Sequence, residues 1–135
     1  KAVSIGDGFR AGEIPGSLFH DEILHEPRLG IHRPTNHAGG LEGGITNGED
    51  VLVVLFQKPI ATLREGLPSV DLDTKEPHRA QYERSDVTAV PACGVIAEAM
   101  LAFVLADALL EKAGGDSMDE VRRNYEGFLA AQRSF

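Results

Sequence analysis

Residues 89–110 read AVPACGVIAEAMLAFVLADALL, and this stretch decides the expected fold of the chain. Within it only Glu98 and Asp107 carry charge. An apolar run of this length also fits a membrane span, but two charges inside it and Pro91 near its start argue against that interpretation. We predict a helix over about residues 94–112 that is apolar on nearly all sides and therefore buried on most of them. A layer of sheet above the helix and another below it would explain the pattern.

A second helix is expected directly after the first. Gly114 and Gly115 are suitable residues for ending the first helix. Ser117 can cap the next one, and Glu120, three residues on, completes a capping box. The apolar residues that follow recur at helical spacing, so we predict an amphipathic helix to about residue 131.

The residues before these helices are rich in glycine, proline and short apolar runs. We treat residues 1–135 as part of a single α+β domain, in which 1–90 are strand- and loop-rich and 91–135 form the two helices. Residues 9–30 contain many breakers and are expected to be irregular. Asn47-Gly48 is a strong signal for a hairpin turn. The predicted strands are 1–5, 50–57 (buried, because both faces are apolar), 67–72 and 77–82.

Composition limits the class of protein. The chain has 135 residues, 42% of them hydrophobic and 25% charged, which is typical of a globular protein. Its net charge of -8 argues against a nucleic-acid-binding surface. Cys93 is the only cysteine, so no internal disulfide is possible, and this fits the cytosol. The chain begins at Lys1, without a methionine, and at once reads like a strand, so we expect it to be part of a longer protein.

Three polar features could carry chemistry. The glycines of residues 35–44 (TNHAGGLEGG) would let a backbone approach a ligand, although a turn with a strand bulge explains them equally well. Lys58, directly after the predicted buried strand, could bind a phosphate with help from Thr62, or could be an ordinary surface lysine. Arg84-Ser85-Asp86 could bind a phosphate or ring system and handle a proton, or could form a local ion pair at a helix entrance.

The sequence offers no recognisable metal site or nucleophile. The five histidines show no spacing typical of zinc ligands, and one cysteine cannot build a cysteine-based site. There is no Gly-x-Ser-x-Gly elbow. We interpret Cys93 as a small core residue beside the long helix.

Taken together and in order, these motifs resemble the chorismate synthase family. The resemblance covers nearly the whole chain, and it is specific because it rests on many motifs in sequence. The matching stretches include Ile5-Gly6-Asp7-Gly8-Phe9, Thr35 to Gly48 (TNHAGGLEGGITNG), Lys58-Pro59-Ile60 with Thr62, Glu83-Arg84-Ser85-Asp86-Val87 and Gly114-Gly115-Asp116-Ser117.

The resemblance implies a fold and an activity. The family fold is a β-α-β sandwich with helices layered between sheets, assembled as a homotetramer. Its members are lyases that convert 5-enolpyruvylshikimate-3-phosphate to chorismate and phosphate in the biosynthesis of aromatic amino acids. They require reduced FMN (FMNH2) although the reaction has no net redox change. Whether the flavin is reduced by a partner enzyme or by an intrinsic, NADP-linked activity stays open.

Several site residues follow from the resemblance. Asp86 would be the catalytic aspartate near flavin N5, and Arg84 would contact FMN or the substrate. Asn36 and Ala38 are candidates for the scaffold of the glycine loop. The other FMN-binding candidates are Gly43, Lys58 (near the phosphate), Pro59, Ile60, Ala61 and Thr62 (a hydroxyl partner).

Other parts of the family site would lie on the missing N-terminal side. The two catalytic histidines and most of the phosphate-binding arginines belong there, so none of the five histidines here inherits a catalytic role. We therefore expect this chain alone to be inactive. We expect a cytoplasmic protein without nucleic-acid or membrane partners. A flavin- or nucleotide-binding module without catalysis, and a purely structural module, stay open as alternatives.

Overall fold

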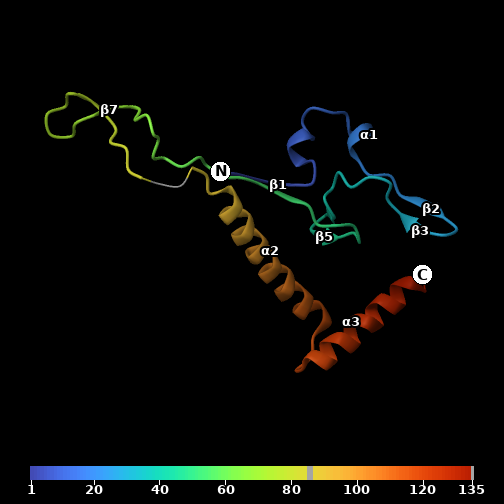
Figure 1. The fold of residues 1–135 in the computed structure, drawn as a ribbon. Coiled ribbons are helices and arrows are strands. Elements are labelled where there is room, and N and C mark those ends of the chain that lie inside the picture. Colours follow the sequence, from blue (N-terminus) through green and yellow to red (C-terminus); the bar gives the residue numbers. More distant parts are fainter. Residues whose placement is uncertain (85–86, 135) are drawn as a thin grey trace. The chain divides into compact units, whose positions relative to one another are not determined.

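In the computed structural model, which describes residues 1–84 and 87–134, the chain forms two compact units, Lys1–Pro59 and Ile60–Phe135. Four sheets are described, and each is a two-stranded antiparallel ladder. Two long helices, α2 (Val90–Ala113) and α3 (Met118–Arg133), complete the second unit (Figure 1). The elements are thus those of an α+β protein, as predicted.

The first unit is organised by strands β1 (Ala2–Ile5) and β6 (Val53–Phe56), which pair in antiparallel register with Ser4 opposite Val54. The strand predicted at 1–5 is confirmed. The prediction of a buried strand over 50–57 is wrong in length and in burial, since β6 has four residues and most of it is exposed. Apolar residues occur on both faces of β6, but a two-stranded ladder buries neither face unless a further layer covers it.

Residues 9–30, expected to be irregular, contain more structure than predicted. A 3-10 turn, η1 (Gly8–Arg10), is followed by one turn of helix, α1 (Gly16–Phe19). Strands β2 (Leu24–Glu26) and β3 (Gly30–His32) then form a hairpin. Their short sequences lack the alternation of apolar and polar residues that identifies a half-buried strand.

A second hairpin lies in the glycine-rich stretch. Strands β4 (Leu41–Glu42) and β5 (Ile45–Thr46) pair across a turn at Gly43-Gly44. The hairpin turn predicted at Asn47-Gly48 is therefore wrong by four residues. Two signals of similar strength lie close together here, and the pairing of Glu42 with Ile45 selects the first.

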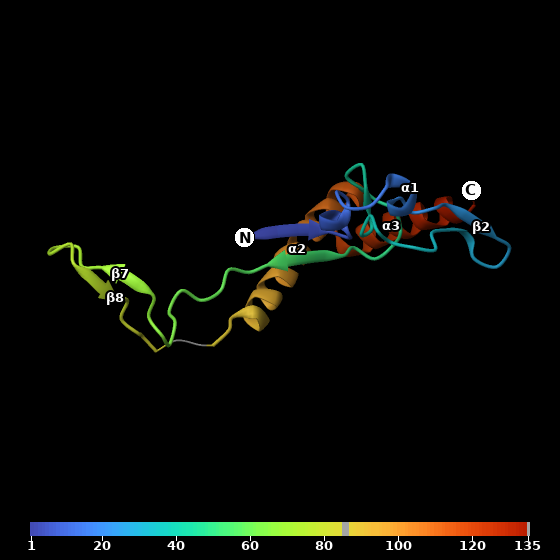
Figure 2. The same ribbon diagram turned by 90° about the horizontal axis from the view of Figure 1, so that it is seen from above.

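The second unit begins with a hairpin of β7 (Pro68–Val70) and β8 (Pro77–Arg79), close to the strands predicted at 67–72 and 77–82 (Figure 2). The Asp71 carboxylate accepts hydrogen bonds from the backbone N–H groups of Asp73 (2.9 Å) and Thr74 (2.8 Å). This local pattern competes with strand pairing and reverses the chain.

Helix α2 (Val90–Ala113) confirms the long predicted helix and begins four residues before the predicted start. Its predicted burial is wrong for the part of the chain that the structure describes: no residue of α2 is buried, and Phe103 and Val95 are 74% and 68% exposed. By length and composition α2 could also cross a membrane, a test that the core helix of a soluble protein passes too. Within its own unit α2 contacts α3, and this contact leaves the apolar sides of α2 uncovered in the described part of the chain.

Helix α3 (Met118–Arg133) begins as predicted at an N-cap, Ser117, whose Oγ accepts a hydrogen bond from the Glu120 N–H (3.3 Å). The Glu120 carboxylate reaches back to the N–H of Asp116 (2.8 Å), one residue earlier than in the usual capping box. The Ser117 bond satisfies an N–H group that the first helical turn leaves without a partner, and the Asp116 bond ties the preceding residue to that turn. Val121 is buried where α3 meets the end of α2.

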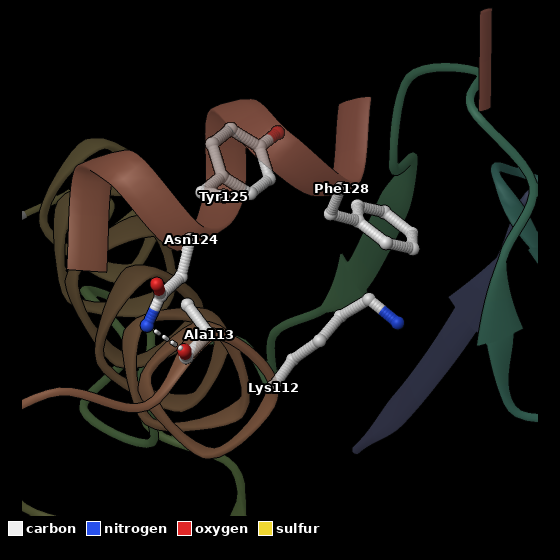
Figure 3. Close-up of a pocket in the computed structure, with 5 residues that line it drawn as sticks. All are labelled: Lys112, Ala113, Asn124, Tyr125 and Phe128. Atoms are coloured by element: carbon white, nitrogen blue, oxygen red, sulfur yellow. Dashed lines mark hydrogen bonds between the residues drawn. The ribbon is translucent and has the colours of Figure 1, made fainter. Parts of the chain in front are cut away.

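The C-terminal end of α2 borders a pocket lined by Lys112, Ala113, Asn124, Tyr125 and Phe128 (Figure 3). Asn124 donates a hydrogen bond to the Ala113 carbonyl (2.9 Å), and the Lys112 ammonium lies 4.1 Å from the centre of the Phe128 ring. Both contacts place polar hydrogens and positive charge at the end of the helix where carbonyl groups lack partners. These two contacts join α3 to α2. None of the predicted site residues lines the pocket.

Candidate functional site

The turn that carries Gly43 is open on its outer side. Gly43 and Gly44 have φ values of +59° and +78°, the conformation that a two-residue type I′ turn needs at both central positions. A Cβ placed on Gly43 would meet nothing within 4 Å, and the residue is exposed. The backbone of this turn can thus be approached closely by a ligand, which is the property on which the prediction of a flavin contact depends.

Three glycines next to this hairpin pack directly against other backbone atoms, and we call Gly6, Gly39 and Gly40 the glycine junction. A Cβ on Gly6 would lie 2.2 Å from the His37 carbonyl oxygen, and one on Gly39 would lie 2.3 Å from the Gly6 nitrogen. A Cβ on Gly40 would lie 2.5 Å from the Asp50 carbonyl oxygen. Real Cβ atoms do not approach other atoms so closely, so the junction accepts no side chain.

Asn36 connects Gly40 of the glycine junction to the backbone of Asp50. Its Oδ1 accepts a hydrogen bond from the Gly40 N–H (2.8 Å), and its Nδ2 donates one to the Asp50 carbonyl (2.9 Å). Its own carbonyl accepts from the Gly39 N–H (3.1 Å). The prediction that Asn36 supports the loop agrees with this geometry.

Asp21 supports the start of the same loop from outside it. Its carboxylate accepts hydrogen bonds from the Thr35 hydroxyl (2.7 Å) and from the N–H groups of His37 (2.8 Å) and Ala38 (2.8 Å). Desolvation is the largest single influence on the pKa of Asp21 and raises it, but the hydrogen bonds from Thr35, Ala38 and His37 together outweigh it and lower the pKa. The carboxylate therefore stays charged and holds the loop.

A histidine and an aspartate meet beside this loop. His37 Nδ1 lies 2.8 Å from Asp7 Oδ2, and the Asp7 N–H donates to the His37 carbonyl (2.8 Å). The imidazole also stacks on Phe19, with ring centroids 6.0 Å apart. Sequence analysis missed this pair, because its partners lie 30 residues apart along the chain.

Arg33 holds the hairpin next to Gly43. Its guanidinium lies 2.7 Å from a carboxylate oxygen of Glu42, and the Asn47 side chain donates to the same oxygen (2.8 Å). The Arg33 side chain is only 16% exposed, and its Nε has no hydrogen-bond partner among the described residues. The low exposure of the guanidinium strengthens its attraction to Glu42 but also costs desolvation. Sequence analysis missed Arg33 because nothing in its neighbours distinguishes it from a surface arginine.

The Lys58 to Thr62 segment follows β6 without regular structure. Lys58 is exposed, and its ammonium makes no hydrogen bond or ion pair with any residue that the structure describes. Gly43, Lys58 and Pro59 belong to the first unit, whereas Ile60, Ala61 and Thr62 belong to the second. Thr62 is half-buried.

Arg84 lies in the second unit and is exposed. The β7–β8 hairpin returns the chain toward the residues that follow Thr62, because the Ala80 N–H donates to the Leu67 carbonyl (3.0 Å). Asp86, the predicted catalytic residue, and Ser85 lie outside the described residues. Within the described ranges no cluster of three or more His, Cys, Asp or Glu side chains could hold a metal ion.

Comparison with known proteins identifies the family. The family model described as chorismate synthase matches residues 1–110. This chain belongs to the chorismate synthase family. A solved structure titled "Crystal Structure of Chorismate Synthase" covers 100% of this chain with a TM-score of 0.69 and 40% sequence identity, and the chain covers 32% of it. The predicted fold class and family are thereby confirmed.

Curated chorismate synthases match the entire chain. The protein of Geobacter sulfurreducens is 55% identical, that of Thermoanaerobacter pseudethanolicus 50% and that of Trichlorobacter lovleyi 56%. In each alignment all of this chain is covered, but only 36%, 39% and 36% of the relative. The chain thus spans little more than a third of the chorismate synthases that it matches.

Proposed function

We propose that this chain supplies part of the active site of a chorismate synthase, a lyase of aromatic amino acid biosynthesis. The substrate would be 5-enolpyruvylshikimate-3-phosphate and the products chorismate and phosphate. One ring C–O bond and one ring C–H bond break and a second ring double bond forms. Phosphate carries away the electrons of the C–O bond and the hydrogen departs as a proton, so no net oxidation occurs.

The observation that carries this proposal is the pairing of two features in one unit. Lys58 presents an ammonium without a partner among the described residues, and the Gly43-Gly44 turn presents an open backbone on a rigid base. An exposed ammonium binds phosphate as a point charge, and exposed backbone N–H groups donate hydrogen bonds to the oxygens of a cofactor. These donors fit a flavin mononucleotide, which carries one phosphate and a polar ring.

The chain's own residues would hold reduced FMN and the substrate in the following way. Lys58 and the Thr62 hydroxyl would bind the FMN phosphate side, with Pro59, Ile60 and Ala61 lining the site between them. Gly43 would contact the flavin through its backbone. Arg84 would offset negative charge on the flavin or the substrate. Asp86 would accept or relay the ring proton.

Reduced FMN would supply transient electron density to the substrate, which is chemistry that no protein side chain provides. The protein would contribute position and electrostatic field. The remaining family histidines and arginines would come from the part of the polypeptide outside these residues. Flavin reduction, linked to NADP in the predicted class, would be a separate step.

The assembly and location are part of the same proposal. We propose a cytoplasmic homotetramer in which further protein covers the exposed sides of α2. Glu98 and Asp107 lie within α2 and would be costly in a membrane interior. The net charge of -8 disfavours nucleic acid as a partner.

The experiment uses the polypeptide at the full length of its chorismate synthase relatives. FMN titration followed by the change in flavin absorbance tests the cofactor, and phosphate release from 5-enolpyruvylshikimate-3-phosphate under reducing conditions tests the reaction. Lys58→Met should weaken FMN binding by about tenfold, and Lys58→Arg should retain most of it because the charge remains. FMN binding without phosphate release would favour the alternative of a flavin-binding module without catalysis. The absence of both would overturn the proposal.

A further inference from the structure

The Gly43-Gly44 turn and Lys58 need a fixed separation if both contact one ligand. Gly43 lies in the β4–β5 hairpin, and Lys58 follows the end of β6. Among the described residues no hydrogen bond joins the turn to Lys58 directly. Their separation must therefore be set by whatever connects the base of the hairpin to the start of β6.

The base of the hairpin is closed by a backbone hydrogen bond. The Asn47 N–H donates to the Gly40 carbonyl (3.1 Å), directly outside the pairing of Leu41 with Thr46. The Gly40 carbonyl thus anchors the base of the hairpin that carries the Gly43-Gly44 turn.

The start of β6 is held by the other two glycines of the glycine junction, Gly39 and Gly6. The Leu52 N–H donates to the Gly39 carbonyl (3.1 Å), and the Leu52 carbonyl accepts from the Gly6 N–H (2.9 Å). Asp50 lies two residues earlier, and its carbonyl would be only 2.5 Å from a Cβ on Gly40. Here the backbone before β6 and the backbone before the hairpin are in van der Waals contact.

One side chain bonds both of these segments. Asn36 accepts from the Gly40 N–H with Oδ1 and donates to the Asp50 carbonyl with Nδ2. An amide can do this because it carries a donor and an acceptor on one rigid plane. Removing either arm would break the side-chain link between Gly40 and the Asp50 carbonyl, and the two segments would then be held by the backbone hydrogen bonds of Leu52 to Gly39 and Gly6.

We infer that Asn36 is a positioning residue that sets the distance between the Gly43-Gly44 turn and Lys58. It thereby determines the affinity for FMN, whose ring and phosphate these two groups would contact at the same time. The inference rests on the proposed function, since it concerns the same FMN site. The Asn36 side chain bonds to Gly40 and Asp50, and not to Gly43 or Lys58. Its effect passes through Gly40 on one side and Asp50 on the other.

The test compares substitutions of Asn36 with a matched substitution elsewhere in the full-length polypeptide. Asn36→Ala removes both arms, and Asn36→Asp keeps the acceptor for Gly40 while removing the donor to Asp50. Asn124→Ala is the control, because Asn124 also donates from Nδ2 to a backbone carbonyl at 2.9 Å, but at the end of α2. FMN is titrated by flavin absorbance at a temperature at which circular dichroism shows every variant folded.

The expected result is a graded loss of FMN affinity. Asn36→Ala should raise the FMN dissociation constant about tenfold or more, since small displacements of positioning groups have effects of this size, and Asn36→Asp should raise it less. The absorbance change of the bound flavin should also differ from that of the unsubstituted protein. Asn124→Ala should leave both readouts within about twofold, although its melting temperature falls.

Each other outcome overturns the inference in a distinguishable way. If the unsubstituted protein binds FMN and Asn36→Ala binds it equally well, Asn36 has no positioning role and the proposed function stands. If Asn124→Ala weakens FMN binding as much as Asn36→Ala does, the effect is general destabilisation. If the unsubstituted protein does not bind FMN, the proposed cofactor fails first and the inference falls with it. Asn36→Asp keeps the test decisive if Asn36→Ala does not fold.

Discussion

His37 Nδ1 and Asp7 Oδ2 lie 2.8 Å apart although 30 residues separate them in the chain. The pKa of Asp7 is lowered, first by the hydrogen bond from His37 and then by the charge of Arg10. Desolvation raises the pKa, but its effect is smaller than that of the His37 hydrogen bond. A carboxyl with a lowered folded-state pKa stabilises the fold when it is charged. This contribution is complete well above pH 3.8, the ordinary value, and is lost as the pH falls below it through the lowered pKa.

Asp7→Asn should therefore reduce stability at neutral pH and make little difference in acid. Denaturation by urea, followed by circular dichroism at pH 7 and at several values below pH 3.8, measures this for the two proteins. The difference in unfolding free energy should shrink as the pH falls. A difference that stays constant over the whole range would mean that the Asp7 charge does not contribute through this pair.

Gly43→Ala and Gly39→Ala should differ in cost although both glycines have positive φ. At Gly43 a methyl group meets nothing within 4 Å, so only the backbone conformation is strained, which costs about 1 kcal/mol. At Gly39 the methyl group would also lie 2.3 Å from the Gly6 nitrogen, so the cost should be roughly 3 kcal/mol or more. Thermal melts of the two variants measure the difference, and equal melting temperatures would contradict the packing of the glycine junction.

Asp86→Asn in the full-length polypeptide should abolish most turnover and leave FMN binding intact. A positioned proton acceptor contributes about a hundredfold or more to a rate, and asparagine cannot take up the proton. Phosphate release and FMN titration are measured together. Asp73→Asn, an exposed aspartate in the β7–β8 turn, is the matched control and should retain full turnover. Near-normal turnover of Asp86→Asn would remove Asp86 from the proposed reaction.

The 135-residue chain by itself should associate in solution. Helix α2 exposes Val95, Ile96 and Phe103, each more than 60% exposed, and such a surface favours contact with other apolar surfaces. Light scattering should give a mass above 14.5 kDa that rises with concentration. Phe103→Glu should reduce the association, because the charge would be buried by it. A mass of 14.5 kDa at every concentration would contradict this expectation.

Local patterns in the sequence predicted the elements well. The apolar run at 89–110 and the Ser117–Glu120 cap identified both long helices, because helix signals lie within a few residues of one another. The hairpin of β7 and β8 followed from its polar turn. The turn at Gly43-Gly44 was missed because the nearby Asn47-Gly48 carries an equally strong signal, and pairing between strands decides between them.

The support of the candidate site was less predictable. Asp21 and Asp7 act on a loop that begins 14 or more residues away, and such contacts leave no trace in local spacing. The burial predicted for α2 and β6 was wrong because an apolar sequence shows that a residue can be covered, whereas coverage itself depends on other parts of the protein. The roles of Gly43, Lys58 and Arg84 in binding stay predictions.

The glycine junction also constrains the order in which this chain can fold during synthesis. The Gly6 N–H pairs with the Leu52 carbonyl, so β1 acquires its partner only after more than forty further residues have left the ribosome. The short β4–β5 hairpin can close much earlier, because its strands are adjacent. During the interval the apolar edge of β1 stays unpaired and open to other nascent chains. A pause in translation before Leu52 would lengthen that exposure, and the yield of folded protein should fall with it.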